Sequence, residues 1–72
     1  GDISADFHNQ EIAVLDMKIA MLQHRSRFYK TGDRSEAIHA LGYAQGMAVI
    51  FPAMKDYAEM YIEDITSHMK GR

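Results

Sequence analysis

Apolar residues recur at helical spacing along most of the chain, with one clear interruption. From 4 to 30 they return every three or four positions, which predicts a long amphipathic helix. The pattern breaks at 31–33. Gly32 can adopt the left-handed conformation that ends a helix, and Asp33 followed by Glu36 resembles the start of a capping box. We therefore predict a short turn at 31–33, with the flanking helices folded back on each other as an antiparallel hairpin.

The first predicted helix carries two apolar stripes instead of one. The first stripe contains Ile12, Leu15, Ile19, Leu22 and Tyr29. The second stripe contains Phe7, Val14, Met17, Met21 and Phe28. A single partner helix would need only one stripe, so we expect this helix to contact two neighbours, which are either further helices of the same chain or another subunit.

Between Gly46 and Asp56 the only helix-breaking residue is Pro52, so the second arm must kink or restart near residue 51. Residues 37–54 are apolar nearly all round, so the helix predicted at 34–51 is expected to be covered on most sides. Residues 53–70 form an ordinary amphipathic pattern. We predict an all-α fold in a single domain, 1–72: a helical hairpin whose second arm is kinked or broken at Pro52, effectively three helices.

Length and composition favour self-association. A chain of 72 residues has a small core, and this chain has no cysteine that could form a stabilising disulfide. The formal net charge is −2, which favours neither a strongly basic nor a strongly acidic partner. We expect a homodimeric helical bundle that covers the apolar stripes. The six methionines suit adaptable contacts with a protein partner.

Small residues within the central apolar segment predict a close helix contact. Gly42-x-x-x-Gly46 lets two helix backbones approach, either within the chain or between subunits. No strand precedes these glycines, so a dinucleotide-binding loop is excluded. The residues that we expect at helix–helix or dimer contacts are Met17, Met21, Gly42, Gly46 and Phe51.

The tip of the predicted hairpin, 24–34, contains the most basic cluster of the chain, with aromatic residues between the cations. Cations and aromatic rings together can bind single-stranded nucleic acid or a phosphate-bearing partner. Cations near a helix C-terminus also complement the helix dipole without any ligand. The candidate anion-binding residues are Arg25, Arg27, Lys30 and Arg34.

Catalytic and metal-binding patterns are weak. Glu36-x-x-His39 has the spacing of some metal-binding helix bundles, but Glu36 is better explained as a capping residue. Asp64 and His68 are expected to form a solvated surface pair. We therefore predict no catalytic residues, no metal site and no cofactor.

Residues Ile12, Leu15, Asp16, Lys18, Ile19 and Leu22 have the spacing Ile-x-x-Leu-Asp-x-Lys-Ile-x-x-Leu. Over about a dozen residues this segment resembles the opening helix of the all-helical chorismate mutases. At the positions of that family's catalytic arginines this chain has Asn9 and Ser26. The resemblance therefore implies no mutase activity.

These patterns favour a small, non-enzymatic protein–protein interaction or regulatory module. It would act through its apolar helix faces as a subunit, adaptor or inhibitor of a larger assembly. The alternative is a nucleic-acid-binding accessory protein that uses the basic tip, 24–34. The sequence has no signal-peptide pattern, and the central helix is too polar for a membrane span. We expect a cytoplasmic protein without membrane contact.

Overall fold

The computed structural model describes the backbone from Ile3 to Gly71 and the side chains from His8 to Gly71. Within that range the fold is all-α. The elements in chain order are α1 (Ile3–Thr31), α2 (Arg34–Ile50), the short 3-10 turn η1 (Pro52–Met54) and α3 (Lys55–Lys70). The prediction of an all-helical chain with three helices is confirmed. Phe7, which the sequence assigns to the second stripe of α1, lies outside the described side chains.

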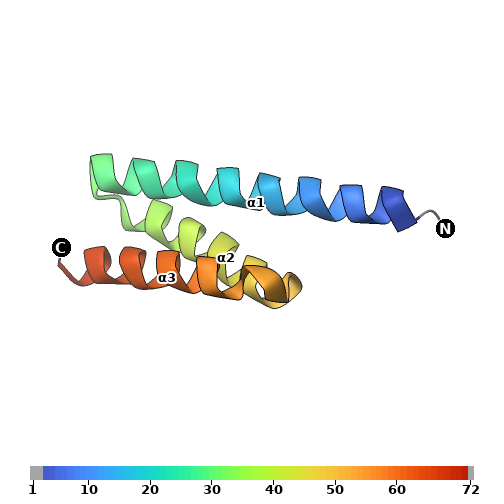
Figure 1. Cartoon of the computed structure of the whole chain (residues 1–72). Helices are drawn as coiled ribbons and strands as arrows, with labels where there is room; N and C mark the ends of the chain where they lie inside the picture. Colours follow the sequence, from blue (N-terminus) through green and yellow to red (C-terminus); the bar gives the residue numbers. More distant parts are fainter. Residues whose placement is uncertain (1–2, 72) are drawn as a thin grey trace.

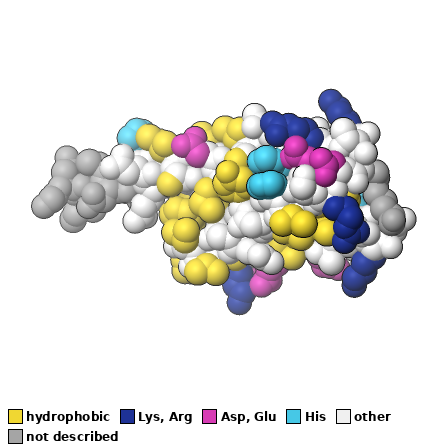
Figure 2. Space-filling model, turned by 180° about the vertical axis from the view of Figure 1, so that it is seen from behind, with side chains coloured by type: hydrophobic (Ala, Val, Ile, Leu, Met, Phe, Trp, Pro, Cys, Tyr) yellow, Lys and Arg dark blue, Asp and Glu magenta, His cyan; other side chains and the backbone are white. Residues whose placement is uncertain are grey.

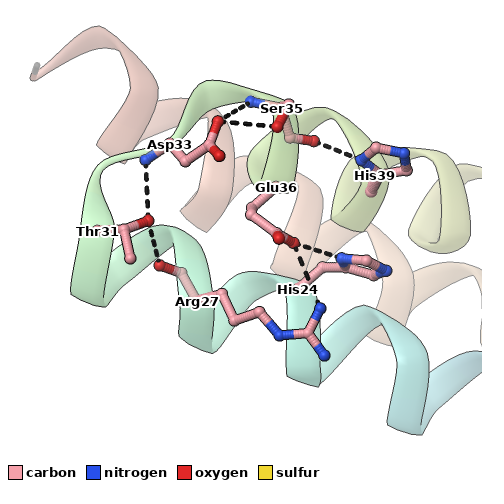
Figure 3. A network of polar contacts seen from close by, with 7 residues as sticks. All are labelled: His24, Arg27, Thr31, Asp33, Ser35, Glu36 and His39. Carbon is pink, nitrogen blue, oxygen red and sulfur yellow. Dashed lines mark hydrogen bonds and ion pairs between the residues drawn. The ribbon is translucent and has the colours of Figure 1, made fainter.

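Local side-chain chemistry forms the turn between α1 and α2. Gly32 has a φ of 75°, and its N–H donates to the carbonyl of Phe28 at 2.7 Å. A side-chain oxygen of Asp33 accepts the N–H of Ser35 at 2.9 Å and so caps α2. Figure 3 shows that Glu36 points toward His24 instead of back to the cap. The expected capping box is therefore half formed, because the hydroxyl of Thr31 accepts the N–H of Asp33 in place of Glu36.

Pro52 separates α2 from α3. The backbone of Phe51 leaves helical geometry with φ −123° and ψ 87°, and Pro52 opens the 3-10 turn. The N–H of Phe51 still bonds to the carbonyl of Met47, and the N–H of Met54 bonds to the carbonyl of Phe51. The non-helical dihedral angles of Phe51 show that the second arm is broken rather than gently kinked, and these two bonds satisfy N–H groups on both sides of the break.

The helix α2 lies between the two others and contributes half of the completely buried side chains. Figure 1 shows α1 and α3 running in the same direction, with α2 antiparallel between them. The side chains that are completely buried are Met21, Phe28, Ala37, Ala40, Ala44, Met47, Ala58 and Ile65. Four of these are alanines, which lets the helices approach closely and leaves the larger side chains to fill the gaps.

The longest helix is only partly covered. α1 has 29 residues and α2 has 17, and Figure 1 shows the N-terminal part of α1 extending past the corner formed by η1. The molecule is elongated, with principal extents of 48 × 19 × 12 Å. In the part of the chain that the structure describes, no helix is both long and apolar enough to cross a membrane.

Candidate interaction surface

The two apolar stripes of α1 differ in burial: one packs against α2 and the other is partly exposed. The second stripe faces α2: Met21 and Phe28 are completely buried, and Met17 packs against the core. Four residues of the first stripe remain partly exposed. Their exposed fractions are 45% for Ile12, 55% for Leu15, 45% for Ile19 and 36% for Leu22. We call these four residues the Ile–Leu seam.

Contacts between α1 and α3 explain why the seam stays open. The ammonium of Lys18 lies 4.9 Å from the centre of the Tyr57 ring, and the ring of Tyr29 stacks on His68 with centroids 4.3 Å apart. The two helices run parallel, with partners 39 positions apart in both pairs. α3 therefore covers the part of α1 that carries Lys18, Arg25 and Tyr29 and stops short of the seam.

A charged cluster fixes this register. Nε and Nη2 of Arg25 donate to one carboxylate oxygen of Asp64 at 3.0 and 2.7 Å. The hydroxyl of Tyr29 donates to the same oxygen at 2.5 Å, and the guanidinium of Arg25 lies 4.4 Å from the centre of the Tyr29 ring. Asp64 and His68 form the expected i,i+4 pair, at 3.7 Å, with the two side chains 36% and 46% exposed. In addition, Asp64 is the acceptor at the centre of a contact between α1 and α3, which the sequence did not predict.

The cluster shifts the pKa values of its members. The hydrogen bonds from Tyr29 and then Arg25 lower the pKa of Asp64. Burial and the hydrogen bond to Asp64 raise the pKa of Tyr29. Burial by itself would lower the pKa of Arg25, but its bond to Asp64 and the nearby Tyr29 raise it overall. The cluster is therefore held as an arginine cation and a carboxylate anion beside a neutral phenol.

The other predicted anion-binding residues do not form one open cationic surface with Arg25. Arg27 lies 3.7 Å from the carboxylate of Glu36, and Nη1 of Arg34 donates to the carbonyl of Met69 at 3.4 Å. Lys30 is exposed, and among the described residues it has no carboxylate partner. Two of the four cations are thus paired with carboxylates, which reduces the charge that the tip presents to an anion.

A second polar cluster joins α1 to the start of α2 (Figure 3). Nδ1 of His24 lies 2.5 Å from Glu36, and the His24 ring stacks on His39 and on Tyr43, with centroids 5.1 and 5.7 Å away. Nδ1 of His39 is hydrogen-bonded to the carbonyl of Ser35. Glu36 and His39 therefore do not converge on a common point. Within the described residues, no group of three acidic, histidine or cysteine side chains could hold a metal ion.

The two glycines of the small-residue motif have different surroundings. A Cβ on Gly46 would lie 3.1 Å from the terminal methyl of Met17, so this glycine marks a close approach between α2 and α1. A Cβ on Gly42 would meet nothing within 4 Å. Phe51, also expected at a helix contact, packs partly buried against the core at the corner.

The methionines are mostly core residues. Met21 and Met47 are completely buried, and Met17, Met54 and Met69 pack against the core. Met60 alone among the methionines is strongly exposed, at 56%. The sequence-based idea that the methionines supply an adaptable surface is therefore wrong for most of them.

The outer face of α2 is a second exposed apolar area. Ile38, Val49 and Ile50 are all more than half exposed, and Val49 reaches 80%. Figure 2, which views the molecule from behind, shows apolar side chains in the middle of the face beside histidine side chains. Unlike the seam, these residues do not form a continuous row with regular spacing.

A shallow groove of about 440 Å³ lies where α1 passes the corner. It is lined mainly by apolar surface from Val14 and Leu15 on α1 and from Phe51 and Met54 at the corner. Leu15 belongs both to this groove and to the seam, so apolar surface continues from one to the other.

No protein-family model, no curated protein and no solved structure matches this chain.

Proposed function

We propose that this protein is a small, non-enzymatic helical interaction module whose Ile–Leu seam binds an apolar helix of a protein partner. It would serve as a subunit, adaptor or inhibitor within a larger assembly. The observation that carries the proposal is the exposure of four aligned aliphatic side chains, 36% to 55% each, on a helix whose other residues pack against α2 and bond to α3.

The exposure of these four side chains is unfavourable unless a partner covers them. Together the four side chains expose about as much surface as two complete aliphatic side chains, whose burial contributes roughly 3 to 6 kcal/mol. The internal polar groups, in contrast, are satisfied: among the described residues, no buried side-chain nitrogen or oxygen lacks a hydrogen-bond partner. The apolar seam is therefore the surface whose burial by a partner would contribute most to the free energy of binding.

Seam-dependent capture tests this proposal. Ile19→Glu places a charge at the centre of the seam, and Val49→Glu places the same charge on the outer face of α2, where it serves as the matched control. We expect immobilised wild-type chain and the Val49→Glu variant to retain the same proteins from the native cell, and the Ile19→Glu variant to lose them. Circular dichroism should give the same helix content for all three chains. Equal retention by both variants would contradict the proposal.

A further inference from the structure

The seam has the spacing and residue types of a two-stranded coiled coil. Ile12, Leu15, Ile19 and Leu22 are separated by three, four and three positions, so they fill the a and d positions of two successive heptads. Isoleucine occupies both a positions and leucine both d positions, the distribution that in parallel coiled coils favours pairs of helices over larger assemblies. The partner that fits such a seam is a helix with the same pattern.

A second copy of α1 supplies that pattern in either of two orientations. In a parallel pair each seam residue would meet its own counterpart. In an antiparallel pair, Ile12 would lie against the partner's Leu22, and Leu15 against the partner's Ile19. Both orientations bury all four seam residues of each chain, so the apolar layers alone do not choose between them.

The charges that flank the seam choose the antiparallel orientation. In a parallel pair Glu11 would face the partner's Asp16, and Arg25 would face the partner's Lys30; both are like-charge contacts that occur on each side of the pair. In an antiparallel pair Glu11 would face the partner's Arg25, and symmetry would make this attraction twice. Asp16 and Lys18 would each meet their own counterparts near the two-fold axis. These are two like-charge contacts, against four in the parallel pair, so the balance of charges favours the antiparallel orientation.

The bonds already made by Arg25 permit the antiparallel contact. Arg25 carries five N–H donors, and its bonds to Asp64 and Tyr29 do not use all of them, so a carboxylate of the partner can still be bound. The ends of the seam agree with this orientation. His8 would lie opposite the partner's Ser26, a polar pair that can share a hydrogen bond, whereas a parallel pair would bring two His8 rings together.

We propose that a second copy of this chain covers the seam, with the two α1 helices antiparallel and Ile12 packed on the partner's Leu22. This inference rests on the function proposed above and names the partner. Four aliphatic side chains per copy make an interface below the standard size of roughly 800 Å² per partner, so the dimer is reversible, with a dissociation constant on the order of micromolar.

Distances between spin labels test the orientation. The chain has no cysteine, so Ser26→Cys and His8→Cys each provide one nitroxide attachment site at an exposed position. In the antiparallel dimer, a mixture of the two labelled chains gives a short intermolecular distance. Chains labelled only at residue 26 are separated along the helix axis by 18 residues, about 27 Å. Introducing Ile19→Glu into the labelled chains should remove both distances.

Two results would overturn the inference. A short distance between chains labelled only at residue 26 would indicate parallel helices. The absence of any intermolecular distance at concentrations well above the expected dissociation constant would exclude the second copy as the partner. If the seam-dependent capture described above still occurred in that second case, the proposed function would stand and its partner would be a different protein.

Discussion

The glycines of this chain allow a test of the described packing through three alanine substitutions. Gly42 lies in α2 with nothing within 4 Å of the position of an added Cβ. Alanine is favoured over glycine inside a helix by about 1 kcal/mol, so Gly42→Ala should raise the free energy of unfolding by up to this amount. At Gly46 the new methyl would lie 3.1 Å from the end of Met17, which must move. We expect the displacement of Met17 to offset most of the stabilisation that alanine would otherwise bring at Gly46.

Gly32→Ala should act in the opposite direction. Its φ of 75° is in the left-handed region, where an L-residue with a Cβ is strained by about 1 to 2 kcal/mol. Urea unfolding followed by circular dichroism gives the free energies, and it should be repeated at several chain concentrations because association adds to apparent stability. The expected order of stability is Gly42→Ala, then Gly46→Ala, then Gly32→Ala.

One result would refute this reasoning directly. If Gly42→Ala lowered stability, and did so more strongly at high chain concentration, the outer face of α2 would be packed against another copy. The open surroundings of Gly42 would then be filled in the assembled state, and the principal interface would lie on α2 instead of on the Ile–Leu seam.

Three further predictions concern the core, the charged cluster and the basic tip. Met21→Ala removes a completely buried side chain and should lower the unfolding free energy by about 2 to 5 kcal/mol, measured by urea unfolding; a loss well below this range would contradict the described burial. The pKa of Asp64 is lowered from 3.8, so the contribution of its carboxylate to stability is present above that pH and is lost as the pH falls through the lowered pKa. The Asp64→Asn variant should therefore unfold less steeply with decreasing pH than the wild type. An acid titration that is the same for both chains would indicate that the charged cluster is absent in solution. We expect no nucleic-acid binding at physiological salt, measured by fluorescence anisotropy with a labelled oligonucleotide. Tight, salt-dependent binding that weakens in an Arg27→Gln, Lys30→Gln double variant would instead support the alternative function.

The helical architecture could be predicted from the sequence because its determinants are local. The left-handed glycine at Gly32, the missing N–H of Pro52 and the periodicity of the apolar residues act within a few positions of the chain. The two stripes of α1 were also readable, although the sequence did not distinguish the stripe that faces α2 from the stripe that stays open.

The features that depend on how the helices lie against one another could not be predicted. The bond between Arg25 and Asp64 joins residues 39 positions apart, and it depends on the register of α3 along α1. Sequence reasoning therefore assigned Arg25 to an open basic patch and Asp64 to a surface pair, and it did not connect the two. In the same way, Gly42 and Gly46 share one motif, but the path of α1 across α2 brings Met17 over only one of them.

Sedimentation equilibrium of the purified chain tests the central claim most directly. We predict that the wild-type chain and the Val49→Glu variant reach twice the 8.2 kDa chain mass as the concentration rises through the micromolar range. The Ile19→Glu variant should remain at the mass of one chain. A wild-type chain that stays monomeric throughout, or an Ile19→Glu variant that dimerises as well as the wild type, would contradict the claim that the Ile–Leu seam is where two copies meet.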